Sequence, residues 1–469
     1  MDILEHPQAQ ALLADAVLSA DAVRSCAERL TAFAQRYLPF FHRCEQREHA
    51  LAILRGKLSG LERKTIEPIA LQAGISRRPL QLFVGAGGWN DRAVLAELHR
   101  HVANDLGDEE GVFILDSSGF PKKGEASCGV ARQWCGRLGK IDNCQVGVFL
   151  AYTSPRGQAL LDGRLYLPED WAADGERRAQ THVPDEVAFA EKWRLGLELL
   201  DGVPGGWVVG DDEFGRCTAL REALRLRQLR YVLDVPCNTL VREPSERQPL
   251  GPNGQPRRPG FERVDHWAAR QPAGRWKTVK VRDGEKGPLR VKVLPATAQT
   301  KDEDGCVGAL ERVAVLRTCA AKPQTWYTLS NARRERRAKV AQVHGGRQRM
   351  EELLGAGKGE VGLDQCEVRS WVGWHHHLTL SLLALWFLQG ERSRLGKKTP
   401  AVTVPQVRAI FTELLREPSP SAERIAEVVG AVLRRNEESR IYHWYSATGQ
   451  FPPRRPPPGP KRSARPKRN

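Results

Sequence analysis

Apolar residues recur at intervals of three and four through the first hundred residues, as in Ala11–Leu18 and again from Ala93 onward. Side chains at this spacing fall on one face of an α-helix. Alternating runs of β-branched residues, which would indicate strands, are few in this part of the chain. The pattern therefore predicts a helical domain over residues 1–105.

The pattern changes after Gly111 to short apolar runs bounded by turn residues, a spacing typical of buried strands. The runs are Val112–Leu115, Gln145–Tyr152, Trp207–Gly210 and Arg230–Val235. Helical periodicity lies between them, over Asp185–Leu200 and Thr218–Leu226. Strands that alternate with helices predict an α/β core, whose first part we assign to residues 106–235.

Residues 236–310 interrupt this pattern, being rich in proline, glycine and arginine, with strand-like pieces such as Leu289–Leu294. We predict a β-rich insertion here, after which the core resumes over residues 311–390. A helical C-terminal region follows over 391–450. Residues 451–469 contain seven Lys/Arg, seven prolines and no acidic residue, so we predict a disordered basic tail.

The whole chain is strongly basic. Its 469 residues include 72 Lys and Arg against 56 Asp and Glu, a formal net charge of +16. Such an excess favours a polyanionic partner, because neutralised phosphates release their counterions. No signal peptide and no apolar run long enough for a bilayer are evident, and the ten cysteines lack zinc-finger spacing. We expect a cytoplasmic protein with reduced cysteines and no membrane partner.

Two aspartates follow predicted strands directly. Asp116 comes after Phe113–Leu115, and Asp211 comes after Trp207–Gly210. Ligand sites in α/β sheets lie at the carboxyl ends of strands, and carboxylates there are suited to a divalent metal. An aspartate in this position can instead cap a helix or begin a turn. These two residues are therefore candidates, with both interpretations open.

The segment Asp116–Gly124, continued through Ser127–Val146, closely resembles the first catalytic block of bacterial insertion-sequence DDE transposases. In that family the opening aspartate is the first metal ligand, which corresponds to Asp116 here. Many relatives have two adjacent aspartates at this point, whereas this chain has Ser117 in the second position. The resemblance implies a metal-dependent enzyme that cuts and joins DNA.

A second block, Trp207–Gly215, resembles the family pattern of an apolar strand, an aspartate, two variable residues, an aromatic residue and a glycine. Asp211 occupies the position of the aspartate. Its neighbour Asp212 is the competing candidate. Adjacent strand residues point to opposite sides of a sheet, so we do not expect both to bind the same metal.

A third block is similar to the family signature Tyr-x2-Arg-x3-Glu-x6-Lys. This chain has His344, Arg347, Glu351 and Lys358 at that spacing, with histidine in place of tyrosine. On a helix these positions would fall within a stripe of roughly 60°. Nearby glycines predict a shorter helix, over about 347–354, which would leave Lys358 on a loop.

The resemblance implies an RNase H-like catalytic core that is interrupted by the β-rich insertion and preceded by the helical domain. Asp116, Asp211 and Glu351 would bind two Mg²⁺ or Mn²⁺ ions. Phosphates would be held by Lys122, Lys123, Arg347 and Lys358. The implied partners are double-stranded DNA at transposon ends and target, and a second copy of the chain as a homodimer, with the protein at the nucleoid when bound.

Two other functions remain open at this stage. Because Ser117 and His344 depart from the family pattern, the chain could be a DNA-binding transposase relic that no longer cuts. It could also be a metal-dependent nuclease without strand transfer. A cleavage and joining assay would distinguish the three.

Three further motifs have both a structural and a DNA-binding interpretation. Ala70, Gly74 and Leu80 have helix-turn-helix spacing, with Ser76 placed to cap the second helix and Arg77 and Arg78 placed to contact DNA. Trp267 and Trp276 could stack on bases or pack in a core, the latter being favoured. The histidines at 375–377 would point in three directions on a helix, which favours DNA contact or packing over metal binding.

Overall fold

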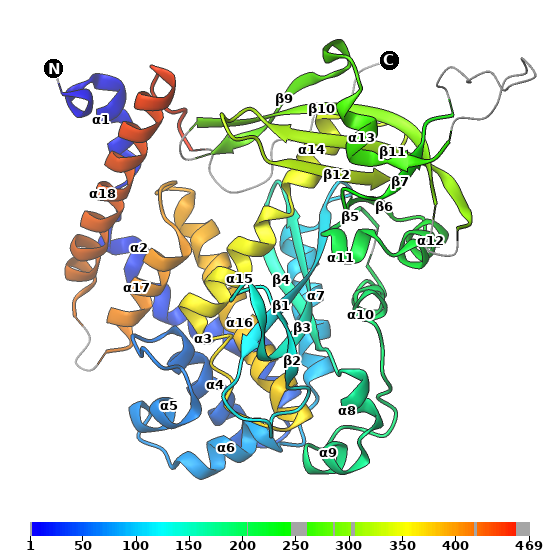
Figure 1. Ribbon diagram of the computed structural model, residues 1–469. Coiled ribbons are helices and arrows are strands. Elements are labelled where there is room, and N and C mark those ends of the chain that lie inside the picture. Colours follow the sequence, from blue (N-terminus) through cyan, green and yellow to red (C-terminus); the bar gives the residue numbers. More distant parts are fainter. Residues whose placement is uncertain are drawn as a thin grey trace, which may run out of the picture. The chain divides into compact units, whose positions relative to one another are not determined.

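The computed structural model describes residues 2–203, 205–244, 260–284, 287–301, 305–416 and 420–455 (Figure 1). The predicted basic tail lies outside these ranges from residue 456 on. The chain forms two compact units. The first contains Met1–Asp108, Ser117–Ala190 and Glu351–Asn469, and the second contains Glu109–Asp116 and Glu191–Met350.

The first unit begins with helices, as the periodicity predicts. Capping explains where several of them start: the Ser19 hydroxyl accepts from the amide of Ala22, and the Asn90 side chain accepts from the amide of Ala93. The N-terminal α-helices are α1 (Pro7–Ala14), α2 (Ala20–Arg24), α3 (Cys26–Tyr37), α4 (Cys44–Leu58), α5 (Ile66–Gln72), α6 (Arg77–Gly85) and α7 (Asp91–Leu106).

The strands of the first unit form an antiparallel group. β3 (Lys140–Ser154) is hydrogen-bonded to β2 (Ala131–Cys135) on one side and to β4 (Gly157–Leu165) along its second half. β1 (Val112–Pro121) is also a neighbour of β3, and the part of β1 from Ser117 on belongs to this unit. Two short helices follow the strands, α8 (Glu169–Ala173) and α9 (Gly175–Gln180).

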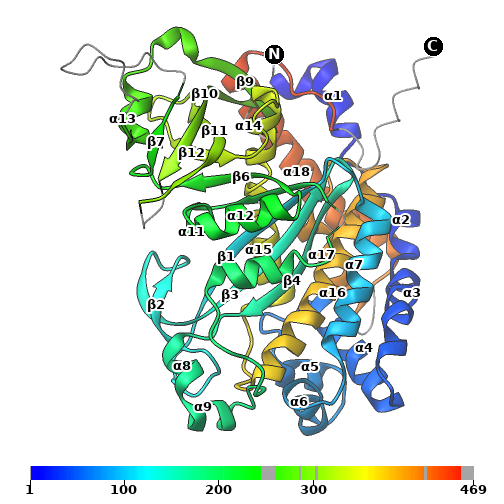
Figure 2. The same ribbon diagram turned by 90° about the vertical axis from the view of Figure 1, so that its right-hand side faces the viewer.

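The core of the first unit is organised around one long helix, α16 (Trp371–Gly396). Its residues from Gly373 to Gln389 are all buried. Figure 2 shows α16 and α7 lying against the strand layer, and α16 also contacts α4 and α6. The remaining helices are α15 (Gln348–Val361), α17 (Val404–Leu414) and α18 (Ala422–Thr448). Among the described residues, no helix is long and apolar enough to cross a membrane.

The second unit contains most strands of a single 12-stranded sheet, to which β2, β3 and β4 also belong. From one edge to the other its strands follow the order β1, β5, β6, β12, β11, β10, β7 and β8, with β9 beside β10. The pairs β1–β5 and β5–β6 are parallel, whereas β6–β12, β12–β11 and β11–β10 are antiparallel. The bounds are β5 (Trp207–Gly210), β6 (Arg230–Val235), β7 (Leu240–Arg242), β8 (Glu262–Arg263), β9 (Lys277–Gly284), β10 (Gly287–Lys301), β11 (Val307–Thr318) and β12 (Thr325–Ser330).

Helices connect these strands: α10 (Lys192–Leu199), α11 (Asp212–Gly215), α12 (Thr218–Leu226), α13 (Val264–Ala269) and α14 (Arg337–Gly345). Trp267 is 1% exposed within an apolar core that also contains Val235 and Leu294, and Trp276 packs against this core. The predicted core packing of both tryptophans is confirmed.

The structure is a mixed α/β fold, as predicted. The helix predicted over Thr218–Leu226 is confirmed residue for residue. The helix predicted over Asp185–Leu200 is shorter, because only Lys192–Leu199 is helical. The predicted end of the helix near residue 354 is wrong, since α15 continues to Val361 and includes Lys358.

Candidate active site

Asp116 and Asp211 follow the last paired residues of two adjacent parallel strands. In the register of β1 and β5, Leu115 is opposite Gly210, so Asp116 and Asp211 come next on their strands. Neighbouring strands lie about 4.8 Å apart, and residues opposite each other point to the same face of a sheet. The backbone at Asp211 is still extended. Asp116 and Asp211 therefore continue two neighbouring strands from adjacent positions in the sheet.

Helix α11 follows Asp211 at once and is packed tightly against β6. One oxygen of Asp211 accepts from the amide of Glu213 at 3.1 Å, so this aspartate also caps α11. Phe214 is fully buried. A Cβ atom on Gly215 would lie 1.8 Å from the carbonyl oxygen of Asp234, so only glycine fits there. This packing fixes the backbone conformation of the segment that contains Asp211.

A third aspartate, which was not predicted from the sequence, lies on the next strand of the sheet, β6. Gly210 is opposite Leu233 in the parallel pair β5–β6, so Asp234 is next in register after Asp211. Asp234 is 5% exposed, and both of its oxygens are engaged: Nε2 of His344 lies 2.9 Å from one and a guanidinium nitrogen of Arg347 lies 2.7 Å from the other. A charged residue inside an apolar strand was the available signal, because a buried carboxylate requires such partners.

His344 and Arg347 thus share a contact with Asp234 that their spacing did not predict. α14 ends at Gly345 and α15 begins at Gln348, so the expected single stripe is divided between two helices. His344 also contacts the ring of Trp326 edge-on. Both residues are tied to Asp234, and Glu351 follows in the first turn of α15. Glu351 is exposed and begins the last segment of the first unit.

The electrostatics around Asp211 are unfavourable for a bare carboxylate. Burial raises the pKa of Asp211 to about 6; the nearby charge of Arg347 opposes this shift, while Glu213 and Asp212 add to it. Asp212 is in a different environment, since its side chain is 50% exposed and pairs with Arg216 at 3.0 Å. Of the two neighbours, Asp211 is the one whose charged form a bound cation would stabilise more.

Within the described ranges, no three His, Cys, Asp or Glu side chains are already gathered closely enough to hold a metal ion. The donors available at the strand ends still fit a divalent cation, because carboxylate oxygens are the ligands that Mg²⁺ and Mn²⁺ prefer. Asp116 and Asp211 can supply them from adjacent strands, whereas the oxygens of Asp234 are occupied by His344 and Arg347.

A comparison with protein families matches residues 36–288 to the DDE superfamily endonucleases. The chain belongs to this family. Members cut DNA with the help of divalent metal ions, so the protein is a metal-dependent nuclease whose substrate is DNA, and the mixed α/β fold is consistent with an RNase H-like nuclease. The matched segment includes Asp116 and Asp211 and ends before Glu351. No curated protein matches the chain.

The lysines of the endonuclease that were predicted to hold phosphates have different surroundings. Nζ of Lys358 donates to the Ser118 hydroxyl at 2.8 Å and lies over the ring of Phe120. Nζ of Lys122 donates to the carbonyl oxygen of Cys366 at 2.5 Å, while Lys123 is exposed. Lys358 thus connects α15 to β1, and Lys123 is the more accessible of the two adjacent lysines.

The predicted helix-turn-helix residues form two short helices with a turn at Gly74, whose φ of +64° suits glycine. Ser76 occupies the N-cap of α6, but its hydroxyl accepts no capping hydrogen bond there. Arg77 and Arg78 are both exposed at the start of α6, and Arg77 pairs with Glu67 at 2.6 Å. The helix pair is confirmed, and contact of these arginines with DNA stays a prediction.

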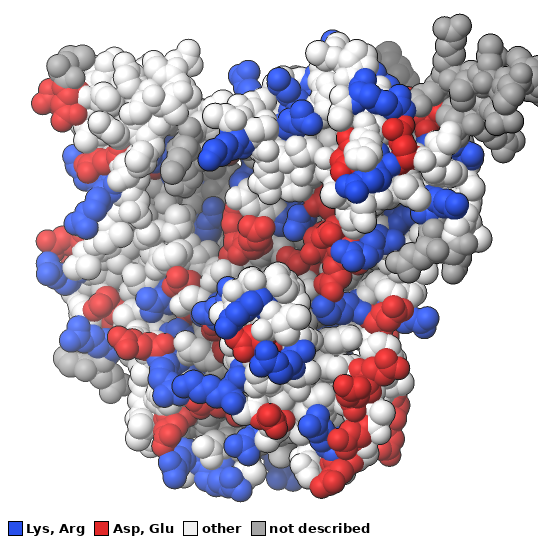
Figure 3. Space-filling view, viewed as in Figure 1, with Lys and Arg blue, Asp and Glu red and all other residues white. Residues whose placement is uncertain are grey.

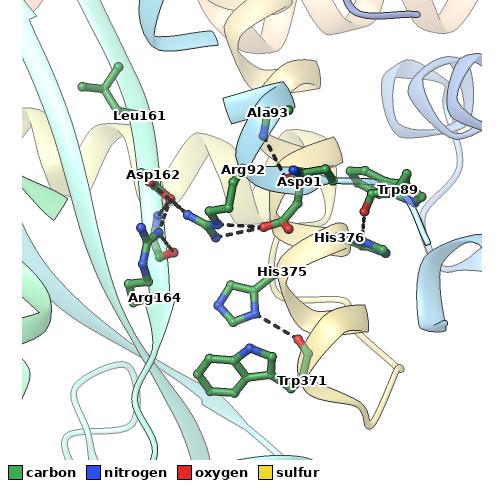
Figure 4. Close-up of polar contacts among 12 residues, drawn as sticks. Trp89, Asp91, Arg92, Ala93, Leu161, Asp162, Arg164, Trp371, His375 and His376 are labelled. Atoms are coloured by element: carbon green, nitrogen blue, oxygen red, sulfur yellow. Dashed lines mark hydrogen bonds and ion pairs between the residues drawn. The ribbon is translucent and has the colours of Figure 1, made fainter. Parts of the chain in front are cut away.

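The three consecutive histidines are packing residues of α16. His376 stacks on Trp89 with ring centroids 3.7 Å apart, and its ring nitrogens face the carbonyl oxygens of Val84 and Trp89 (Figure 4). His375 is hydrogen-bonded to the carbonyl oxygen of Trp371, and His377 to that of Leu363. Burial lowers the pKa of all three rings. Of the alternatives inferred from the sequence, packing is the one the structure supports.

Proposed function

We propose that this endonuclease is an insertion-sequence transposase, which cuts transposon ends and joins the freed 3′-hydroxyl to target DNA. Asp116, Asp211 and Glu351 are its catalytic residues and bind two Mg²⁺ or Mn²⁺ ions. The observation that supports this proposal is the register of β1 and β5, in which the last paired residues, Leu115 and Gly210, directly precede Asp116 and Asp211. Glu351 is included on its spacing from Arg347 and Lys358, which matches the Tyr-Arg-Glu-Lys signature apart from His344.

The protein's own groups have distinct tasks in this proposal. Asp116 and Asp211 supply oxygen ligands from a rigid strand edge, and the ions they hold would activate water and then the 3′-hydroxyl. Asp234 orients His344 and Arg347 at the neighbouring strand. Lys122, Lys123, Arg347 and Lys358 place positive charge for DNA phosphates. Two transposon ends must be held together while each is joined to target DNA, which favours a homodimer during the reaction.

The domain organisation follows the same proposal. An RNase H-like core over 106–235 and 311–390 is interrupted by the β-rich segment 236–310, and the helical domain 1–105 binds DNA through Arg77 and Arg78. Acting on DNA inside the cell, the protein would be found in the cytoplasm and at the nucleoid.

The test is cleavage and joining of DNA that carries the flanks of the gene, with full-length protein and Mg²⁺. We expect Asp116→Asn, Asp211→Asn and Glu351→Gln each to reduce cutting by at least about a hundredfold. The matched controls are Asp212→Asn and Glu352→Gln, which remove a neighbouring carboxylate and should stay within about threefold of the unchanged protein.

Each outcome separates one alternative. Undiminished cutting by any of the three variants would remove that residue from the site. Cutting without joined products would favour a nuclease that lacks strand transfer, and binding without cutting by the unchanged protein would favour a relic. An Asp212→Asn protein as inactive as Asp211→Asn would reopen the choice between these neighbours.

A further inference from the structure

Strands β2 and β3 and the turn between them form a hairpin with an apolar outer face. Trp134 is opposite Ile141 in the antiparallel register, and the chain turns between Gly136 and Gly139, whose φ of +63° suits glycine. The amides of Leu138 and Gly139 both donate to the carbonyl oxygen of Cys135, at 2.9 and 3.0 Å. The hairpin is therefore a defined structure, and Figure 2 shows β2 at the border of its unit.

The inner face of this hairpin accounts for its folding. Cys135 and Cys144 are fully buried and form a small apolar cluster with Val146, against which Tyr166 packs. The Gln133 side chain adds a hydrogen bond to the carbonyl oxygen of Cys144 at 2.9 Å. Because these contacts hold the hairpin in place, the residues of the outer face are not needed to anchor it.

The outer face exposes three large apolar side chains in one place. Trp134 is 61% exposed, Ile141 is 60% exposed and Leu138, at the turn, is 41% exposed. Single exposed apolar residues are ordinary, but a cross-strand pair together with the adjoining turn forms a continuous apolar surface. A tryptophan ring gains free energy when it is buried, so its exposure here indicates a surface that a partner covers.

Basic residues outnumber acidic ones in the segment that carries this apolar surface. Residues 122–142 contain five Lys and Arg and two Asp and Glu. Arg132 is exposed two residues before Trp134 on the same strand face. Two other cations of the hairpin are paired, Lys140 with Asp142 at 2.9 Å and Arg137 with Asp364 at 2.5 Å. Figure 3 shows lysine and arginine side chains, together with acidic ones, on the face of the molecule on which β2 lies. Cations around a flat aromatic ring suit a nucleic acid, with its phosphates and stackable bases, better than an apolar protein surface.

We propose that this hairpin is a base-stacking wedge, in which Trp134 stacks on a DNA base that is unpaired at a strand end. Ile141 and Leu138 fill the space beside the stacked base, and Arg132 contacts the adjoining phosphate. Apolar wedges of this kind enter DNA where base pairs are already weakened, because unstacking costs least there. The inference rests on DNA as the substrate and deepens the proposed function by naming how an end is distinguished from intact duplex.

The experiment compares two DNA duplexes of the same sequence, one intact and one with unpaired bases at its 3′ end. Binding of the full-length protein is measured by fluorescence anisotropy with EDTA present, so that cutting is not required. We expect the unchanged protein to prefer the unpaired end. Trp134→Ala should lose at least about fivefold of affinity for that DNA and less than about twofold for intact duplex.

Two further variants separate stacking from other roles. Trp134→Phe retains an aromatic face and should keep most of the preference. Arg132→Gln should weaken binding to both DNAs about equally and reduce its dependence on salt. Thermal unfolding of each variant confirms that the hairpin's buried face is intact.

The possible results are distinct. If Trp134→Ala binds both DNAs as the unchanged protein does, the wedge is overturned while DNA cutting by the unchanged protein still supports the proposed function. If Trp134→Ala instead changes the sedimentation of the protein, the surface joins two copies of the chain and the proposal is also overturned. If the unchanged protein neither binds nor cuts either DNA, the proposed function fails together with the wedge.

Discussion

The charged form of Asp211 is unfavourable in the folded protein, and the positive charge nearby does not fully compensate for this. Burial raises its pKa to about 6 although Arg347 is nearby, and Glu213 and Asp212 raise it further. The folded chain therefore holds a proton that the unfolded chain releases between about pH 4 and pH 6. The contribution of this group to the free energy of unfolding falls as pH rises through that range and stays low at neutral pH.

Removal of this charge should stabilise the metal-free protein while it abolishes cutting. We expect Asp211→Asn to raise the free energy of unfolding at pH 7.5 by up to about 3 kcal/mol, measured by chemical denaturation with EDTA present. At pH 4 the gain should nearly disappear. Asp212→Asn, which only breaks an exposed pair with Arg216, should show no gain. A variant at 211 that is destabilised at pH 7.5 would contradict this account.

Some residues of the candidate site could be identified from the sequence, and others could not. Asp116 and Asp211 were identifiable as candidates because each follows an apolar run, and the residues just before them, Leu115 and Gly210, are paired between β1 and β5. The role of Asp234 was not identifiable, since its partners His344 and Arg347 are more than a hundred residues away along the chain. Only the folded sheet brings those three residues together.

At the scale of helices and strands, Asp162 joins β4 to α7. Arg164 lies 2.8 Å from this buried carboxylate, and Arg92 at the start of α7 lies 3.2 Å from it (Figure 4). Burial alone would raise the pKa of Asp162, but the charges of Arg164 and Arg92 and the proximity of His99 outweigh it and hold the pKa below its usual range. Stability from this group is therefore present above about pH 4 and is lost as pH falls further.

Loss of this carboxylate should loosen the contact between the two elements. We expect Asp162→Asn to lower the free energy of unfolding at pH 7 by about 3 kcal/mol, because two guanidinium groups lose their partner. The difference from the unchanged protein should shrink as pH falls below 4. Asp142→Asn, which removes the partner of the exposed Lys140, is the matched control and should change stability by less than about 1 kcal/mol. Equal effects of the two substitutions would contradict the role of Asp162.

Element boundaries were predictable where local pattern and tertiary packing agree. The strong amphipathic pattern of Thr218–Leu226 coincides with α12. Intrinsic helix propensity predicted too short a helix around Glu351, because glycines destabilise helices. In α15 the backbone at Gly357 packs so closely that a Cβ atom would lie 3.0 Å from Leu363. Packing against a neighbour thus stabilises a helix that propensity alone would end.

At the scale of the whole molecule, the excess of positive charge governs how DNA binding depends on salt. Residues 456–469 contain five of the basic residues and no acidic residue. If these cations contact phosphates, each adds roughly 0.9 to the slope of log Kd against log salt concentration. Deletion of residues 456–469 is therefore expected to reduce the slope by up to about 4.5.

Anisotropy titrations over a range of salt concentrations would measure this change. The folded part should be unaffected, so the midpoint of thermal unfolding serves as the control. A variant in which Lys461 and Arg462 alone become glutamine should lose about two fifths of the same effect. An unchanged slope after the deletion would show that the basic tail does not touch DNA.

Gly215 bears on how relatives of this protein should be recognised. It belongs to the same short motif as Asp211, yet the reason for it is steric, because the carbonyl oxygen of Asp234 leaves no room for a side chain. In an evolutionary comparison the two positions would look equally constant. A descendant that lost catalysis while keeping its fold would be free to replace Asp211 but would still retain Gly215. The glycine is thus a marker of ancestry, and under the proposed function the aspartate is the marker of a working enzyme.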